Sequence, residues 1–398
     1  MKINWKRNLI ITWIGCFFTG ASMNLVMPFI PVYIEQLGTS KNQVELFSGL
    51  AISITAFASA IVAPIWGNLA DRKGRKIMMI RAASGMTITM GALAFVPNVY
   101  WLLILRFFNG VLAGYIPNAT AMIASQAPKE RSGWALGTLS TGAIAGTLIG
   151  PSIGGALAQW FGMKNVFLIT GGILLVTALL TILFVQEQFQ PVEKEDIIST
   201  KEIFSKMQYF SILIGLFLTT LILQMDVNSI NPILTLYIRS LSHDHSNILF
   251  ISGLIVSSAG ISAVISSPIF GRLGDKIGNQ KILLVGLLLS IICYIPMSFA
   301  QSPLQLGILR FLLGFATGAL MPSINTLINK ITPTEGISRI YSYNQMCSNF
   351  GQVLGPLVGS TVAHSFGYRM VFIVTACFAF SNICLSLFNF RKVLNKRF

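Results

Sequence analysis

Charged residues are scarce in this sequence. Only 10% of its 398 residues are Asp, Glu, Lys or Arg, against roughly a quarter in soluble globular domains. Hydrophobic residues make up 54% of the chain, so a water-soluble fold would lack the polar side chains to cover its surface. The composition excludes an ordinary soluble domain and indicates that lipid is the solvent of this chain.

Residue types that carry metal or catalytic chemistry are also few. The five cysteines form no CxxC pair and lie in apolar runs, and there are only three histidines. This pattern is typical of small buried hydrophobic residues, not of metal ligands or a disulfide framework. The sequence has no nucleotide-binding GxxxxGK[ST] motif and no paired catalytic constellation. We therefore expect no metal, no cofactor, no enzymatic activity and no ATP-driven transport by this chain alone.

Acidic residues are outnumbered by basic ones. The 13 Asp and Glu residues stand against 28 Lys and Arg residues, which gives a formal net charge of +15. The basic residues lie in short clusters between long apolar runs, as in the cytoplasmic loops of membrane proteins. Nucleic acid is therefore not expected as a partner.

Apolar runs of the length of a transmembrane helix recur along the whole chain. We predict an all-α membrane protein with twelve transmembrane helices, the first of them retained because no signal-peptide cleavage site stands out. The predicted spans are roughly 9–34, 46–66, 77–97, 100–124, 134–158, 165–186, 209–238, 249–270, 280–300, 304–328, 338–362 and 369–390. With the N-terminus inside, 21 Lys and Arg residues lie in inner segments and only four in outer segments. This bias predicts that both termini are cytoplasmic.

The two halves of the chain resemble each other at an offset of about 204 residues. The matched segments are NLVMPFIPVYI and NSINPILTLYI, GNLADRKGRK and GRLGDKIGNQ, RFFNGVLAG and RFLLGFATG, GPSIGG and GPLVGS, and FGMKNVF and FGYRMVF. A polar segment separates the halves, so we predict an N-terminal six-helix bundle (1–187), a cytoplasmic linker (188–207) and a C-terminal six-helix bundle (208–398). Parallel repeats of this kind are pseudo-symmetric and place a substrate cavity at their interface.

Three of these segments resemble the major facilitator superfamily. GNLADRKGRK is similar to the hallmark loop between helices 2 and 3 of that family, and Arg106 with Gly110 and Gly114 is similar to its helix-4 motif. The glycine-rich segment in the fifth span resembles the helix-5 "antiporter" motif of drug:proton exporters. Further details, including ITMGALAFVPNVYW and SPLQLGILRFLLG, are similar to the PmrA/MdtG-like branch of bacterial multidrug exporters. The resemblance implies a transporter of the bacterial cell membrane.

The loop that carries the hallmark motif is a candidate cytoplasmic gate. Its residues are Gly67, Asp71, Arg72, Gly74 and Arg75, and the second copy contributes Asp275. The resemblance implies a latch that stabilises one conformation, while the alternative is a loop that only sets topology. The second copy has Asn279 in place of Arg75, which argues against an equivalent second latch.

The helix-5 motif consists of Gly142, Gly146, Gly150, Pro151, Gly154 and Gly155. Its i, i+4 spacing places small residues on one helical face, which permits close helix packing in lipid. A flat surface against the other half of the protein would suit a rocking transporter. Tight packing without motion is the alternative, and the two are compatible.

Charges within predicted spans are costly and need a reason. Asp226 lies inside helix 7, and its repeat equivalent is Ser22. Because a carboxylate in a partly dry cavity can take up a proton, Asp226 is a candidate for proton coupling or cation recognition, with a structural hydrogen-bonding role as the alternative. The family motif implies a part in proton transfer for Arg106, for which bonding to backbone carbonyls is the alternative. Arg81 is expected to snorkel to the interface.

Polar residues near the proline-containing breaks of helices 1 and 7 are cavity candidates: Asn24, Asn228, Gln224 and Tyr237. The leading interpretation is a proton-coupled exporter of amphipathic or cationic organic compounds. Its expected partners are lipophilic small molecules, protons and membrane lipids, and it is expected to work as a monomer. A lipid or glycolipid translocator, a small-metabolite carrier, and a non-transporting receptor or scaffold are the alternatives.

Overall fold

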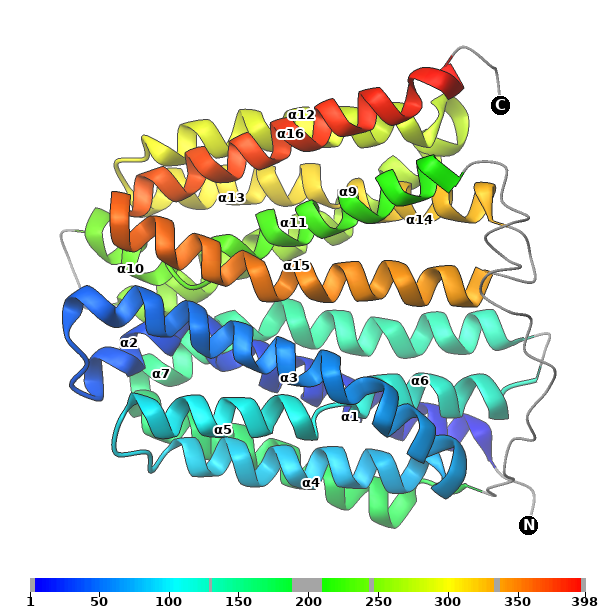
Figure 1. The fold of residues 1–398 in the computed structure, drawn as a ribbon. Helices are drawn as coiled ribbons and strands as arrows, with labels where there is room; N and C mark the ends of the chain where they lie inside the picture. Colours follow the sequence, from blue (N-terminus) through cyan, green and yellow to red (C-terminus); the bar gives the residue numbers. More distant parts are fainter. Residues whose placement is uncertain (1–3, 129–130, 188–209, 243–246, 333–336, 395–398) are drawn as a thin grey trace. The chain divides into compact units, whose positions relative to one another are not determined.

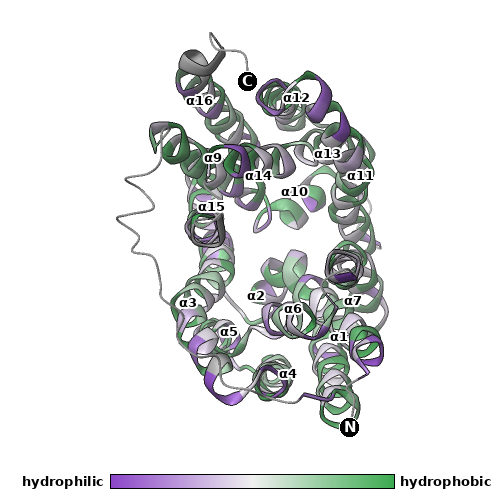
Figure 2. Ribbon diagram, turned by 90° about the vertical axis from the view of Figure 1, so that its right-hand side faces the viewer, coloured by the Kyte–Doolittle hydropathy of each residue, from purple (hydrophilic) through white to green (hydrophobic). Residues whose placement is uncertain are grey.

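The computed structural model describes residues 4–128, 131–187, 210–242, 247–332 and 337–394. Every regular element in these residues is a helix, as the sequence predicts (Figure 1). The predicted linker at 188–207 lies outside the described residues. Hydrophobic residues dominate most of the helices (Figure 2).

The helices of the first half follow the predicted spans, with several spans divided into two helices. They are α1 (Trp5–Val26), η1 (Met27–Phe29), α2 (Ile30–Gln36), η2 (Lys41–Gln43), α3 (Val44–Lys73), α4 (Arg75–Leu93), α5 (Val99–Leu112), α6 (Tyr115–Gln126) and α7 (Ser132–Phe184). The second half has the same pattern. Its helices are α9 (Phe210–Ser229), α10 (Leu234–Leu241), α11 (Ile248–Ile277), α12 (Asn279–Ser298), α13 (Pro303–Thr317), α14 (Leu320–Ile331), α15 (Ile337–Phe366) and α16 (Tyr368–Leu394).

Twelve membrane helices are recovered from these elements. Nine segments of the described residues are long and apolar enough to cross a membrane, and one of them is the 53-residue α7. This helix is interrupted at Gly162, whose φ of 77° and ψ of 160° are not helical, so it contains two spans. The helices α4 and α15 are long enough to be spans but less apolar, at 19 and 30 residues. They complete the predicted set.

The breaks within spans have local causes. Pro28 and Pro31 follow the end of α1, and Pro232 follows the end of α9. Proline cannot donate the backbone hydrogen bond that continues a helix, so each helix restarts one turn later. Between α5 and α6 the break falls at Gly114, whose φ of 124° favours glycine.

The chain divides into two compact units that are described separately. The first contains Met1–Glu193 and Ser246–Ser257, and the second contains Lys194–His245 and Ser258–Phe398. Each unit has its own apolar core. One core is built on residues such as Met79, Tyr115 and Leu139, and the other on residues such as Leu216, Leu287 and Ile324.

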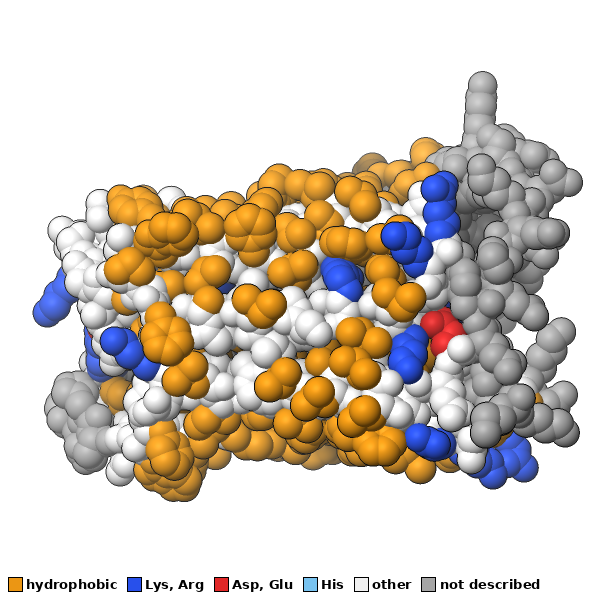
Figure 3. Space-filling view, turned by 90° about the horizontal axis from the view of Figure 1, so that it is seen from below, with side chains coloured by type: hydrophobic (Ala, Val, Ile, Leu, Met, Phe, Trp, Pro, Cys, Tyr) orange, Lys and Arg blue, Asp and Glu red, His pale blue; other side chains and the backbone are white. Residues whose placement is uncertain are grey.

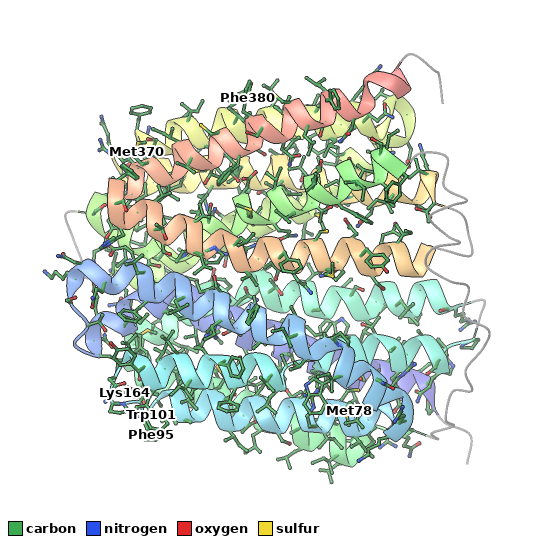
Figure 4. All side chains as sticks on the ribbon, in the orientation of Figure 1. Met78, Phe95, Trp101, Lys164, Met370 and Phe380 are labelled. Atoms are coloured by element: carbon green, nitrogen blue, oxygen red, sulfur yellow. The ribbon has the colours of Figure 1, made fainter. Side chains whose placement is uncertain are left out.

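The outer faces of the helices carry large apolar side chains. Figure 3 shows a broad band of hydrophobic side chains with Lys and Arg gathered towards the ends of the helices. Phe95, Trp101 and Phe380 are 75%, 53% and 60% exposed and point away from the helices (Figure 4). Lys164 lies at the same end of the first unit as Phe95 and Trp101, and Met78 lies towards the opposite end. Such surfaces are suited to lipid and not to water.

Candidate functional site

Asp226 is a buried carboxylate in the second unit. It lies on α9, three residues before the helix ends at Ser229, and is 2% exposed. Its Oδ1 has no hydrogen-bond partner among the described residues. The hydroxyl of Ser229 donates to the backbone carbonyl of Asp226 at 2.9 Å and also contacts Thr375 Oγ1 at 3.0 Å. A buried carboxylate with an unpaired oxygen is costly, so its position favours the binding of a proton or a cation.

Two further buried residues of the same unit are linked to Asp226, one directly and one through the other. Tyr294 of α12 is 1% exposed and interacts electrostatically with both Asp226 and Arg310. Arg310 of α13 is also buried, and its Nε finds no hydrogen-bond partner in the part of the chain that the structure describes. We call Asp226, Tyr294 and Arg310 the acid–tyrosine–arginine cluster. Tyr294 is its central member, since it interacts electrostatically with the acidic and the basic group, each of which lies on a different helix.

Arg106 of α5 is the repeat equivalent of Arg310 and has different surroundings. Its Nε donates to the carbonyl of Ala51 at 3.2 Å, and its Nη2 donates to the Met27 sulfur at 3.6 Å. Thr55 Oγ1 in turn donates to the backbone carbonyl of Arg106 at 2.9 Å. These contacts tie α5 to α3 and to the break after α1. They match the carbonyl-bonding alternative for Arg106.

The amide side chains at the helix breaks bond back to their own helices. Asn24 Nδ2 donates to the carbonyl of Gly20 at 3.0 Å, and Asn228 Nδ2 donates to the carbonyl of Gln224 at 2.8 Å. Asn228 also contacts the Gln224 side chain at 3.3 Å and accepts from Asn231 at 3.2 Å. Asn24, Asn228 and Gln224 are all partly exposed, so they remain candidates for a polar surface on α1 and α9.

Tyr237 has a structural contact that recurs in the first half. Its hydroxyl donates to the carbonyl of Met297 at 2.9 Å, and its repeat equivalent Tyr33 donates to the carbonyl of Leu93 at 2.7 Å. Each tyrosine also packs on a phenylalanine. The ring centroids are 5.2 Å apart for Tyr237 and Phe372, and 4.8 Å apart for Tyr33 and Phe167. Both tyrosines are fully buried. The position therefore fastens a short helix in each half.

The glycines of the helix-5 motif pack against α1. A Cβ on Gly142 or Gly150 would lie 2.7 or 2.8 Å from the carbonyl oxygens of Trp13 or Ala21. The other two members of the row make still closer approaches, Gly146 to the carbonyl of Phe17 and Gly154 to that of Leu25. Four glycines at i, i+4 spacing thus meet four α1 carbonyls at the same spacing. These four glycines lie against α1 of their own unit, which matches the close-packing alternative.

The remaining residues of the motif have separate positions. Pro151 is buried within α7. Gly155 faces the first turn of α11, which groups with this unit, and a Cβ there would lie 2.5 Å from the carbonyl of Leu249. Close packing is the main physical role of the motif in this structure.

The second half repeats this glycine packing on α15. Gly351, Gly355 and Gly359 approach the carbonyls of Leu221, Met225 and Ser229 on α9. Cys347 stands where the first half has Gly142. The glycine row is therefore a feature of both halves, with one member missing in the second.

The α3–α4 turn contains the predicted gate residues. Gly74 has a φ of 98°, ends α3 and begins α4, and Gly278 makes the matching turn with a φ of 100°. Arg72 and Asp275 are exposed, and the side chain of Asp71 lies outside the described part of the chain. The backbone N–H of Arg75 donates to the carboxylate of Glu187 at 2.8 Å.

A cavity of about 290 Å³ adjoins this turn within the first unit. Its lining residues include Gly67 and Arg75, and also Trp66, Gly114 and Asn118. The Arg75 guanidinium donates to the carbonyl of Ala121 on α6. The cavity thus has an aromatic wall and one cationic group.

Arg81 does not extend to the interface as expected. Its guanidinium lies 3.9 Å from the centre of the Trp66 ring and donates to the carbonyl of Ala113 at 3.2 Å. Trp66 Nε1 donates to the carbonyl of Val111 at 2.7 Å. The break at Gly114 frees these carbonyls, and the two side chains satisfy them.

Sequence reasoning missed Tyr294 and Glu187 as parts of these sites. Tyr294 lies in an apolar run and Glu187 at the start of a polar segment. Such residues are common in these places, so no sequence pattern singles them out. The repeat offers one signal, since the equivalents of these residues are Met90 and Lys392. Tyr294 differs from its equivalent in polarity, and Glu187 differs from its equivalent in the sign of its charge.

The fold and these sites define a membrane protein built from two repeated six-helix halves. The sequence profile of the Major Facilitator Superfamily matches residues 12–244 and again residues 216–397. The chain therefore belongs to the Major Facilitator Superfamily.

Its relatives within the superfamily are multidrug efflux proteins. The "Multi-drug resistance efflux pump PmrA homolog" of Lactococcus lactis subsp. lactis is 60% identical over 395 residues, which cover 99% of this chain and 98% of the relative. The "Multi-drug resistance efflux pump PmrA" of Streptococcus pneumoniae serotype 4 is 55% identical over the same length and shares of the two chains. The "Multidrug resistance protein MdtG" of Klebsiella pneumoniae is 50% identical over 391 residues, 98% of this chain and 95% of the relative. The resemblance to PmrA/MdtG-like exporters is confirmed.

Solved transporters share the fold at low sequence identity. A bacterial homolog of the human lysosomal transporter Spinster, crystallised inward-facing and occupied, has a TM-score of 0.80 at 16% identity and covers 98% of this chain and 97% of its own. A mutant of the nucleoside transporter NupG has a TM-score of 0.81 at 13% identity, with 96% and 100% coverage. These likenesses support the predicted major facilitator fold.

Proposed function

We propose that the chain is a proton-coupled secondary transporter that exports amphipathic or cationic organic compounds by alternating access of its two six-helix halves. Relatives that are 50–60% identical over nearly the full length are named as multidrug efflux proteins, which supports the substrate class and the direction. The observation that carries the coupling is the buried Asp226 with its unpaired Oδ1.

One carboxylate suffices for an exchange mechanism. Asp226 can hold a proton or pair with a cationic group, but it does not do both at once. Binding of a cationic substrate therefore favours release of the proton, and protonation favours release of the substrate. Tyr294 interacts electrostatically with both Asp226 and Arg310, so it links the carboxyl group to a basic group of the same unit.

The proposal of a proton-coupled exporter also includes a location and partners for the protein. The concentration of Lys and Arg in alternate connections favours a bacterial cytoplasmic membrane with both termini inside. Lipophilic small molecules and protons are the cargo, lipids surround the apolar outer faces, and a monomer is the working unit. No cofactor is needed, because the proton gradient supplies the driving force.

The test uses purified protein in liposomes with an imposed pH gradient. We expect the gradient to drive movement of ethidium by the wild type, and Asp226→Asn to reduce that movement to the level of protein-free liposomes. Ser22→Ala, at the repeat-equivalent position, is the matched control and should keep most of the activity. Full proton-driven transport by Asp226→Asn would refute its role. Movement of fluorescent phospholipids, with no amphipathic test compound transported, would favour a lipid translocator instead.

A further inference from the structure

Glu187 supplies a cap for a helix that begins more than a hundred residues earlier. Its Oε1 accepts from the backbone N–H of Arg75 and its Oε2 accepts from that of Lys76, both at 2.8 Å. These amides lie in the first turn of α4, where N–H groups have no acceptor within the helix. Gly74, at the N-cap, has no side chain to provide one. A carboxylate at this position satisfies two amides and complements the positive end of the helix dipole.

The position of Glu187 is fixed by the residue before it. The main chain of Gln186 is bonded on both sides by the buried Asn8 of α1. Its N–H donates to Asn8 Oδ1 at 3.0 Å, and its carbonyl accepts from Asn8 Nδ2 at 2.6 Å. Gln126, the last residue of α6, donates to the same carbonyl at 3.1 Å. The chain leaving α7 is therefore held by α1 and α6 at the point where Glu187 reaches α4.

This cap orients the side chains of the α3–α4 turn. With the first amides of α4 fixed, the Arg75 guanidinium reaches the carbonyl of Ala121 and lines the adjoining cavity. Lys76 Nζ donates to the carbonyl of Ile182 near the end of α7 at 3.0 Å. One carboxylate thus binds the backbone amides of the two basic residues that follow Gly74.

The second half keeps the turn, but its sequence has no carboxylate at the position equivalent to Glu187. Gly278 has the same kind of conformation as Gly74, but Asn279 and Lys392 stand at the positions of Arg75 and Glu187. A lysine cannot accept a hydrogen bond from a backbone amide. The equivalent position of the second half therefore cannot supply this carboxylate clamp.

We propose that Glu187 is a positioning residue for the gate. Its carboxylate joins the α3–α4 turn to the segment that directly follows α7, so that the turn and the end of α7 move as one body. The effect on transport rests on the proposed function, whereas the clamp itself does not.

The clamp is tested without transport, by hydrogen exchange of the full-length protein in lipid nanodiscs. In Glu187→Ala the amides of Arg75 and Lys76 should exchange about tenfold faster than in the wild type, because they lose a charge-assisted acceptor. Glu187→Gln should be intermediate, since its single carbonyl oxygen can accept from only one of the two amides in the same geometry. The first turn of α12, beginning at Asn279, is the internal control and should not change. Unchanged exchange at residues 75 and 76 would overturn the clamp.

Its role in transport is tested in liposomes with the same variants and Glu187→Asp. The maximal rate of ethidium movement should fall about tenfold in Glu187→Ala while the half-saturating concentration stays the same, because Glu187 does not contact the substrate. Glu187→Asp retains a carboxylate and should recover part of the rate. Faster exchange with an unchanged maximal rate would refute the gate role. Absence of transport by the wild type would count against the proposed function alone, because the exchange measurement would still judge the clamp.

Discussion

The two halves of the protein share their packing contacts and differ in their buried polar groups. Both fasten a short helix with a tyrosine–carbonyl bond, and both set a row of glycines against backbone carbonyls. Only the second half has a carboxylate at the position of Asp226, and only the first has one at the position of Glu187. The shared features hold helices together, and the unshared features are the places to look for coupling and gating.

The two arginines make the comparison sharpest. Arg106 and Arg310 occupy equivalent positions, yet Arg106 bonds to the carbonyl of Ala51 and Arg310 has an unpartnered Nε among the described residues. Arg310 also interacts electrostatically with Tyr294, which neighbours Asp226. One repeated residue thus has a packing role in one half and belongs to a polar cluster in the other.

The largest difference is expected from neutralising each arginine in turn. Arg310→Gln should lower the pH-gradient-driven transport of ethidium about tenfold or more, because Tyr294, which interacts electrostatically with Asp226, loses its cationic partner. Arg106→Gln should instead lower the thermal stability, because Gln does not span the contacts to Ala51 and Met27, while the folded fraction still transports. Transport per folded protein and heating followed by size-exclusion chromatography measure the two effects. Loss of coupling in stably folded Arg106→Gln would break the comparison and support proton transfer by Arg106.

The glycine rows should respond alike in both halves. Gly154→Ala and Gly359→Ala each place a Cβ against a backbone carbonyl that cannot move without its helix. Each should destabilise its unit by about 1–3 kcal/mol, seen as a lower melting temperature in detergent. Gly172→Ala on α7 is the control, because no heavy atom lies within 4 Å of its added Cβ and alanine favours a helix. Destabilisation by only one of the two variants would show that the rows are not equivalent.

Most of the fold could be predicted from the sequence because membrane helices leave strong signals. Long apolar runs give the spans, prolines give the breaks after α1 and α9, and the repeat gives the two halves. The helix that packs on the four glycines of helix 5 could not be predicted, because small residues favour close packing without specifying the partner. That partner, α1, is decided by tertiary structure.

The candidate sites were predictable only in part. Asp226 stands out because a carboxylate in an apolar run is rare. Tyr294 and Glu187 do not, since a tyrosine in a span and a glutamate at its end are both ordinary. Arg81 was expected to reach the interface, and its actual partners become available only because the chain breaks at Gly114. Contacts between residues far apart in sequence account for each of these gaps.

The smallest expected effect concerns the shared tyrosines. Tyr33→Phe removes a hydrogen bond to the carbonyl of Leu93 and should cost about 1 kcal/mol of stability. Tyr237→Phe should cost somewhat more, because Tyr237 bonds both to the carbonyl of Met297 and to Arg369. Neither variant should change the transport of ethidium per folded protein, because the position serves packing in both halves. If Tyr237→Phe alters the half-saturating ethidium concentration while Tyr33→Phe does not, Tyr237 belongs to the substrate site after all, and a shared contact has acquired a function in one half only.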